Sequence, residues 1–500
     1  MLVSGLLLAV LGLLLLLVPA WAGWISGGLW LVFVLAPLLG YLRVNRLFYQ
    51  ERYQQARQLA AYLRWLHPAD GWLEYPELLR GMELGYQGKI AEARQIIERY
   101  RTNSTTTGRI ANTLIYRLNA RWPELLNWIR QNWTEETVFR DPVIGTYYLR
   151  SLGETGDLNG LLQGLRQFEP KLEKANDIVN LNLVRMFALA FCGQTEAVQQ
   201  LFQGPLAVYS RNTRQFWLAT AELAAGRVEL ARNALVSLQQ HCDPATRQAI
   251  AWRLAQPRLD PERELTAASQ QILAQTKTVI QQEARYGSRF AFTSRKAYAT
   301  YGLIALNLVV FGLEMVRGGS ENLETLYQMG ALVPENVVAG EWWRLLSAIF
   351  LHYGVVHIFA NMLGLYVLGL LVEAILGSGK FLLLYFFSGI GSMVAIAVLA
   401  LLLQVPGLIG VGASGAIMGL LGAMAAILLK GWRQDKAKVA AKRLRLILLI
   451  VGLQVLSDIF TPQVSLVGHA SGLVLGFLAG SLLFKLQDLD RFAQRSSLSK

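Results

Sequence analysis

The chain has 500 residues, of which 53% are hydrophobic and 16% charged, and its net charge is +13. This hydrophobicity excludes intrinsic disorder, and two cysteines exclude a secreted disulfide framework. Residues 1–42 carry no charged side chain, whereas residues 43–296 hold 33 basic and 24 acidic residues and residues 297–500 hold only 14 and 10. The uneven distribution predicts a membrane protein with a soluble middle region.

The first 42 residues predict a two-helix transmembrane hairpin. They exceed the roughly 20 residues of one span, and Pro19 divides them into apolar runs over about 2–19 and 24–42. A cleaved signal peptide is the alternative, because Ala20-Trp21-Ala22 resembles a cleavage site. The hairpin is favoured because the start lacks basic residues and a second apolar run follows at once.

Residues 43–290 predict a soluble cytoplasmic domain made of helices, since apolar residues recur at intervals of three and four. Gly88, Gly156, Gly193 and Gly226 begin similar segments, and their separations fit multiples of about 34, the period of tetratricopeptide helix pairs. The region resembles a degenerate array of this kind, and an unrelated helical bundle is the alternative. An array would offer a concave face to a cytoplasmic protein partner.

The remaining chain predicts six spans and a short cytoplasmic tail, 487–500. The spans are about 298–316, 346–373, 381–404, 413–430, 444–460 and 466–485. Basic residues follow the hairpin and fill the segment 430–445, whereas the loop 317–344 is mainly acidic. Basic loops stay in the cytoplasm, so we expect both termini and the middle domain there, in a multi-pass protein of the plasma membrane. The basic excess thus sets topology, and no nucleic-acid partner is expected.

Four polar residues of this region are candidates for chemistry, because ionisable and polar groups are costly inside a membrane. His357 and Asn361 are four residues apart on one helix face, Ser414 lies in a glycine-rich segment, and His469 lies near the start of the last span. The predicted orientation places all four toward the outer end of their helices. His67 and His241 are interpreted as incidental.

Small residues explain how the candidates could meet. Helices four and six carry glycines at four-residue spacing, which permits close backbone approach: Gly415, Gly419, Gly472, Gly476 and Gly480. This packing would bring Ser414 within hydrogen-bond reach of His469, which could accept the serine proton. The Ser414 N–H, His357 and Asn361 could stabilise an oxyanion. No carboxylate lies near His469 in sequence, so we expect a two-residue dyad and a slow enzyme.

Other hydrolytic chemistries fit less well. The HExxH motif of zinc proteases is absent. An aspartyl protease needs two aspartates on separate spans, and only Asp458 is available. A Ser-Lys pair would use Lys430, which is 16 residues from Ser414 on the same helix and so about 24 Å away. No metal or cofactor is expected.

Several segments resemble the rhomboid intramembrane serine proteases over about residues 298–486. They are Trp342-Trp343-Arg344, His352 to Asn361, Gly412-Ala-Ser414-Gly415 and Gly468-His469-Ala-Ser-Gly472. The resemblance implies a six-helix protease domain, here 291–486, with Ser414 as nucleophile, His469 as base, and His357 and Asn361 stabilising the tetrahedral intermediate. Trp343 and Arg344 would belong to the first outer loop, and His352 would pack near the site.

The sequence therefore predicts an all-α polytopic membrane protein: hairpin, helical-repeat domain and six-helix bundle. The expected function is that of a serine endopeptidase that cuts transmembrane protein substrates near the outer membrane interface. The alternative is an inactive rhomboid-like escort that recruits partners through residues 43–290. A transporter would need polar residues along a complete path, and here they cluster at one end.

Overall fold

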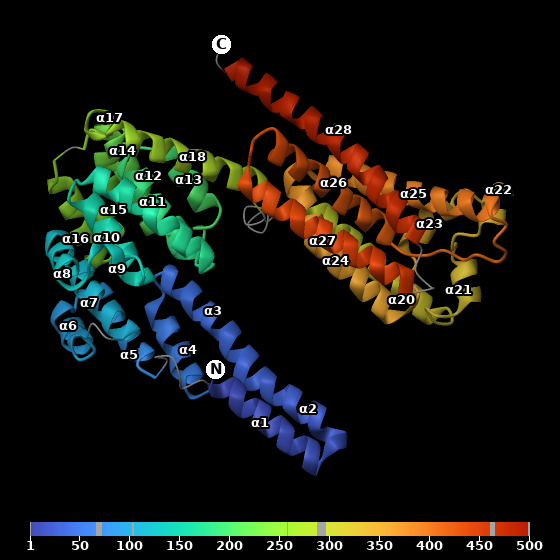
Figure 1. Ribbon diagram of the computed structural model, residues 1–500, viewed down its shortest axis with the longest axis horizontal. Helices are drawn as coiled ribbons and strands as arrows, with labels where there is room; N and C mark the ends of the chain where they lie inside the picture. The colour runs from blue at the N-terminus through green and yellow to red at the C-terminus, as the bar shows by residue number, and fades with distance from the viewer. Residues whose placement is uncertain are drawn as a thin grey trace. The chain divides into compact units, whose positions relative to one another are not determined.

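The protein is built from helices, and the computed structural model describes residues 2–66, 73–102, 105–257, 259–287, 297–460 and 466–498 (Figure 1). The chain forms two compact units, Met1–Gln281 and Gln282–Lys500. Over the described residues there is no strand, and one isolated antiparallel bridge joins Leu332 to Gly410. The predicted all-α class is confirmed.

The N-terminal helices form the expected hairpin. The elements are α1 Leu2–Leu17, α2 Pro19–Trp30, the π-helical turn η1 Leu31–Leu35 and α3 Ala36–Tyr49. Pro19 stands at the first position of α2, where a helix tolerates the missing N–H. α1 packs back on α2, while α2, η1 and α3 run on as one arm (Figure 1).

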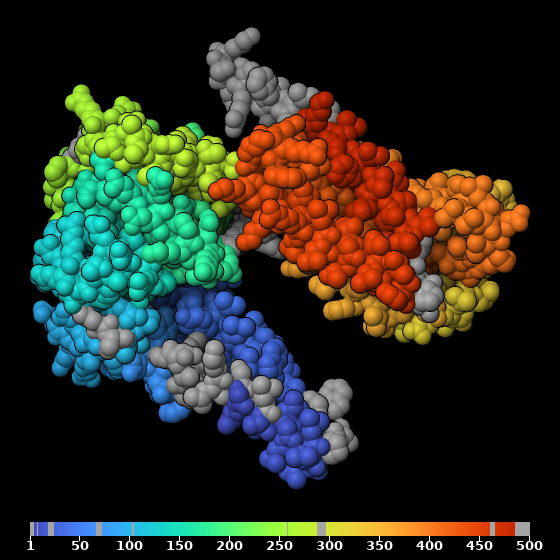
Figure 2. Space-filling model, in the orientation of Figure 1, coloured from blue at the N-terminus to red at the C-terminus, as the bar shows by residue number. Residues whose placement is uncertain are grey.

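The two arms of the hairpin differ in length. The stretch Ile25–Tyr49 is long and apolar enough to cross a membrane, whereas Gly5–Leu17 is shorter. Leucines of the hairpin are exposed, with Leu16 83% exposed, as contact with lipid requires. The hairpin projects from the rest of its unit (Figure 2). Helix α3 continues past the predicted boundary at residue 42, through Arg43 and Arg46.

The rest of unit 1 consists of successive helix pairs. The pairs are α5 Tyr75–Tyr86 with α6 Ile90–Glu98, α7 Thr106–Leu118 with α8 Trp122–Asn132, α10 Pro142–Glu154 with α11 Leu158–Lys174, α12 Ile178–Phe191 with α13 Thr195–Gln203, and α14 Arg211–Ala224 with α15 Val228–His241. Four further helices complete the unit: α4 Tyr53–Leu66, α9 Glu135–Val138, α16 Pro244–Ala255 and α17 Pro261–Glu264. Helix α18, Ala267–Tyr286, leads into unit 2.

The glycines singled out from the sequence lie between the two helices of their pairs. Gly88, Gly156, Gly193 and Gly226 have φ between +70° and +88°, a conformation that glycine adopts without strain. Between α7 and α8 the corresponding turn is made by Ala120, with φ +50°. That alanine explains why the first two glycines are two repeat lengths apart. Membership of the tetratricopeptide class remains a prediction.

Unit 2 contains one helix for each of the six predicted spans. They are α20 Tyr298–Val316, α24 Gly354–Leu376, α25 Ser378–Leu402, α26 Ser414–Arg433, α27 Lys438–Phe460 and α28 Leu466–Leu498. The second span was predicted from residue 346, but α24 begins at Gly354, whose φ of +82° interrupts a helix. The residues before it form α23, Arg344–Ser347, and the 3-10 turn η2, Ala348–Phe350.

The protein is a multi-pass membrane protein. Six helices among the described residues are long and apolar enough to cross a membrane: the N-terminal stretch Ile25–Tyr49, α20, α24, α25, α26 and the part of α28 up to Lys485. α27 is not one of these six, because Arg443, Arg445 and Asp458 interrupt its apolar sequence. Several of its leucines are nevertheless exposed, with Leu448 58% exposed, so it too presents an apolar face.

α26 forms the centre of unit 2 and contacts α28 through backbone atoms. A Cβ added at Gly472 would overlap the Gly415 carbonyl, and one at Gly476 would overlap the Gly419 carbonyl. One turn further, a Cβ at Gly480 would lie 2.5 Å from the Cα of Ala423. The glycine spacing therefore has the packing role predicted for it, since only residues without a side chain allow this separation.

The loop between α20 and α24 is held by Arg344, which is 4% exposed. Its Nη1 donates to the carbonyls of Tyr327 (2.8 Å) and Ala331 (3.0 Å), and its Nε pairs with Glu341. The loop also contains α21 Leu323–Gln328 and α22 Pro334–Val338. These bonds fix the loop beside the start of α26 through the Leu332–Gly410 bridge.

Gly476→Ala tests the backbone contact between α26 and α28. The added methyl group must displace the Gly419 backbone, so we expect a loss of about 1–3 kcal/mol in the free energy of unfolding. Gly302→Ala on α20 is the control, because a Cβ there meets no atom within 4 Å. Thermal unfolding of the full chain in detergent measures both, and equal stability of the two variants would contradict the contact.

Candidate functional site

Ser414 is the first residue of α26, and the turn before it is fixed by backbone hydrogen bonds. The Gly412 N–H donates to the carbonyl of Ala348 (2.9 Å), and Gly410 exchanges two bonds of 2.9 Å with Leu332. Gly412 has φ +126°, which side chains disfavour. The turn places Ser414, which is half-buried, where the first N–H groups of α26 have no intrahelical acceptor.

His357 and Asn361 of α24 face this turn. A Cβ added at Gly412 would lie 2.9 Å from Nε2 of His357 and 3.8 Å from Nδ2 of Asn361. Asn361 is 6% exposed, and its Nδ2 has no hydrogen-bond partner among the described residues. A buried N–H donor without an acceptor destabilises the folded protein unless a bound group accepts its hydrogen bond. The structure thus holds an unused donor beside the turn that precedes Ser414.

The backbone fixes the tautomer of His357. The Tyr353 N–H donates to Nδ1 of His357 at 3.3 Å, so Nδ1 is the unprotonated nitrogen of a neutral ring. The proton then resides on Nε2, the atom that faces Gly412. His357 and Asn361 together direct two N–H donors at one point, the arrangement that stabilises a developing oxyanion.

His469 on α28 is held by a carboxylate. Its Nδ1 lies 2.7 Å from Oδ2 of Asp458, and both residues are buried. The other oxygen of Asp458 accepts a bond of 2.7 Å from Nε2 of Gln454. A carboxylate beside Nδ1 favours the tautomer with the proton on Nδ1. Nε2 of His469 is then the free acceptor.

This contact corrects the sequence analysis, which found no carboxylate near His469. Asp458 lies in the last turn of α27 and His469 in the first turn of α28, so two residues 11 apart in sequence meet from successive helices. The available signal was Asp458 itself, since a lone carboxylate in an apolar span usually has a functional or paired role.

The packing of α26 on α28 brings Ser414 and His469 to one end of the same interface. A Cβ added at Gly415 would lie 3.6 Å from the carbonyl of Gly468, so the residues next to Ser414 and His469 lie close together. Among the described residues no hydrogen bond joins the Ser414 and His469 side chains. Catalytic hydrogen bonds are often long in unliganded structures and shorten on binding.

The other histidines lie apart from this arrangement or support it. His352 is fully buried, its N–H donates to Glu314 (3.0 Å), and its ring centroid is 5.2 Å from that of His357. His241 is exposed at the end of α15, and His67 lies outside the described residues. Over the part of the chain that the structure describes, no three His, Cys, Asp or Glu side chains are grouped to hold a metal ion.

Comparison with known proteins places the similarity in unit 2. The model of the Rhomboid domain family matches residues 339–486. The rhomboid protease GluP of Bacillus subtilis (strain 168) is 36% identical over 203 residues, which are 41% of this chain and 38% of GluP. The rhomboid protein YdcA of the same bacterium is 33% identical over 146 residues, 29% of this chain and 69% of YdcA.

A plant relative extends the comparison. RHOMBOID-like protein 1 of Arabidopsis thaliana is 36% identical over 215 residues, 43% of this chain and 49% of that protein. The chain thus spans half or less of the length of GluP and of this plant protein. The family match begins at residue 339 and contains Ser414, His469, His357 and Asn361.

The hydrogen bonds predict different tautomers for the two histidines. In protein labelled with 15N-histidine and held in lipid nanodiscs, we expect His469 to carry its proton on Nδ1 and His357 on Nε2. Asp458→Asn should move the His469 resonances and leave those of His357 in place, because Tyr353 still donates to His357. An unchanged His469 spectrum in this variant would contradict the Asp458 contact.

Proposed function

The chain belongs to the rhomboid family, and from that premise we propose that it is an intramembrane serine endopeptidase. The observation that carries this proposal is that several groups converge on the start of α26. Two N–H donors, from His357 and Asn361, come from α24. The His469 ring lies across the α26–α28 interface, with Asp458 hydrogen-bonded to its Nδ1. These are the groups that acyl transfer requires: a base for the nucleophile and donors for the oxyanion.

In the proposed reaction, Ser414 Oγ attacks the carbonyl carbon of the scissile peptide bond while His469 Nε2 takes the hydroxyl proton. Asp458 stabilises the imidazolium that forms. The oxyanion accepts hydrogen bonds from the Ser414 N–H, His357 Nε2 and Asn361 Nδ2. The imidazolium then protonates the leaving amine, and the C–N bond breaks to leave an acyl-enzyme. Water, activated by His469, hydrolyses this ester and restores the serine.

The substrates we propose are single-span membrane proteins cut near one face of the bilayer. The site lies at the ends of α24, α26 and α28, so a water-filled opening from that face can supply the water for hydrolysis. A peptide bond within a helix is shielded, so segments rich in small or helix-breaking residues should be preferred. The acidic loop beside the site and the basic segment after α26 favour an outward-facing site in the plasma membrane with both termini cytoplasmic.

Ser414→Ala tests the proposed nucleophile. Cleavage of a model single-span substrate in nanodiscs should fall to background in this variant, because no other residue replaces the attacking oxygen. Ser471→Ala is the matched control, since the Ser471 hydroxyl bonds to the carbonyls of its own helix and should be dispensable. Equal cleavage by wild type and Ser414→Ala would refute the assignment and favour an escort role.

Asp458→Asn tests the proposed role of the carboxylate. The asparagine amide would donate to Nδ1 of His469 and favour the wrong tautomer, so we expect kcat to fall by about 10²-fold or more. KM should change little, because Asp458 is not placed to touch the substrate. Glu324→Gln, which alters an exposed carboxylate of the same unit, should leave kcat unchanged. If Asp458→Asn kept the wild-type kcat, Ser414 and His469 would act as a dyad without the carboxylate.

A further inference from the structure

A cavity of about 340 Å³ lies inside unit 1, away from the residues considered so far. Its walls come from the first helices of the successive pairs, α5, α7, α10, α12 and α14, together with α16 and the end of α3. Seven tyrosines line it: Tyr41, Tyr49, Tyr53, Tyr75, Tyr86, Tyr147 and Tyr209. The volume is that of a site for a small molecule, which typically measures about 300–1,000 Å³.

The chain itself fills part of this inner face. The Tyr49 carbonyl accepts a hydrogen bond from the Ser210 N–H (3.1 Å), and Glu51 accepts one from the Thr213 hydroxyl (2.6 Å). The ring of Tyr53 lies 4.4 Å from that of Tyr86. The segment after the membrane hairpin therefore occupies space that an open array would offer to a protein partner, and the remaining cavity suits a small ligand.

Arg117 supplies a positive charge to the cavity and has no carboxylate bonded to it among the described residues. Its Nη1 donates to the Tyr147 hydroxyl (2.8 Å) and its Nη2 to the Tyr86 hydroxyl (3.3 Å). Among the described residues no carboxylate lies within 4.0 Å of its guanidinium. The one carboxylate that lines the cavity, Glu51, bonds to Thr213 instead. A guanidinium hydrogen-bonded only to neutral hydroxyls lacks the directly paired carboxylate that a shielded arginine normally has.

The second arginine of the cavity, Arg150, adds a positive charge that is only partly neutralised. Arg150 lies 3.4 Å from Glu154, but Glu154 also binds Arg253 at 2.6 Å. Arg150 rests on aromatic rings as well, 4.1 Å from the centroid of Trp122 and 5.0 Å from that of Trp217. One carboxylate thus serves two arginines, which leaves the region with an excess of positive charge.

A buried hydroxyl gives an independent sign of a missing ligand. Thr146 lines the cavity, is 2% exposed, and its Oγ1 has no hydrogen-bond partner among the described residues. It precedes Tyr147, the partner of Arg117, on α10. An unpaired buried hydroxyl is costly, and a ligand acceptor would satisfy it.

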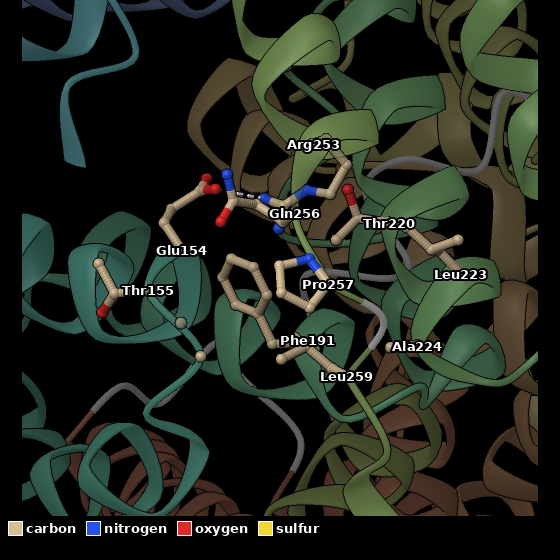
Figure 3. Close-up of a pocket in the computed structure, with 12 residues that line it drawn as sticks. Glu154, Thr155, Phe191, Thr220, Leu223, Ala224, Arg253, Gln256, Pro257 and Leu259 are labelled. Atoms are coloured by element: carbon tan, nitrogen blue, oxygen red, sulfur yellow. Dashed lines mark hydrogen bonds and ion pairs between the residues drawn. The ribbon is translucent and has the colours of Figure 1, made fainter. Parts of the chain in front are cut away.

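A second, smaller cavity in the same unit lacks these features. It measures about 140 Å³ and is lined by Phe191, Thr220, Arg253 and Leu259 among others (Figure 3). Its arginine is already paired with Glu154 at 2.6 Å, and the Thr220 hydroxyl bonds to the Phe216 carbonyl at 2.9 Å. Arg253 Nε has no partner among the described residues, but its guanidinium already pairs with a carboxylate, so this smaller cavity is the weaker candidate for an anion.

We propose that the larger cavity binds a small organic oxyanion, a phosphate monoester or a carboxylate, with Arg117 and Thr146 on the oxyanion and the tyrosine, Phe187 and Trp217 rings around an apolar body. Arginine and hydroxyl donors recognise oxyanions, and the aromatic walls suit an apolar group. The oxyanion can come from a soluble compound or from a lipid headgroup, since α3 enters the cavity directly from a candidate membrane span.

The test uses the full chain in phosphatidylcholine nanodiscs with phenyl phosphate as the soluble probe. Titration calorimetry and thermal unfolding should show saturable binding that raises Tm. Arg117→Gln should weaken binding about tenfold or more, because it removes a charge-assisted contact. Arg130→Gln, on the exposed surface of α8, is the matched control and should bind as wild type. Thr146→Val keeps the side-chain shape and should also weaken binding, so the test survives if Arg117→Gln fails to fold.

Nanodiscs that contain phosphatidylglycerol distinguish the two sources. If the anionic lipid alone raises Tm, and Arg117→Gln or Thr146→Val removes this rise, the ligand is a headgroup. If only phenyl phosphate raises Tm, the ligand is a soluble compound. The absence of any saturable shift with either probe, or equal shifts in wild type and both cavity variants, would overturn the proposal.

Discussion

The backbone contact between α26 and α28 is the constraint on which unit 2 depends. Gly472 and Gly476 lie so close to the carbonyls of Gly415 and Gly419 that no side chain fits between them. Because lipid offers no hydrophobic force between helices, complementary surface shape and dispersion must stabilise this contact. The same contact sets Ser414 and His469 at one end of the interface, so stability and the proposed chemistry have a common origin.

Polar groups inside the apolar parts of the molecule fall into two kinds. Most have fixed partners: Glu373 of α24 accepts bonds from Ala299, Thr300 and Ser378 and so caps the start of α20. Others hold buried atoms without partners among the described residues, and Asn361 in unit 2 and Thr146 in unit 1 are two of these. Both lie where other evidence independently indicates a site, as expected when a reacting group or a ligand completes the hydrogen bonding.

Much of the architecture could be predicted because its signals are local. Apolar length predicted the helices of unit 2, and the glycine spacing predicted the α26–α28 contact. The start of α24 was misplaced because residues 345–351 are mostly apolar yet belong to a loop that the hydrogen bonds of Arg344 hold in place. Composition does not indicate such bonds. Asp458 was missed as the partner of His469 because proximity was judged along the chain. The charge imbalance around Arg117 depends on packing among many helices and has no sequence signature.

We propose that the geometry of unit 2 makes the Ser414 hydroxyl a nucleophile through His469. The most direct measurement is covalent labelling of the full-length protein in nanodiscs by a fluorophosphonate, with the modified residue identified by mass spectrometry. We predict a single adduct on Ser414, formed at a rate that His469→Ala reduces by about 10²-fold or more. Labelling at another residue, or an equal rate without His469, would contradict the account.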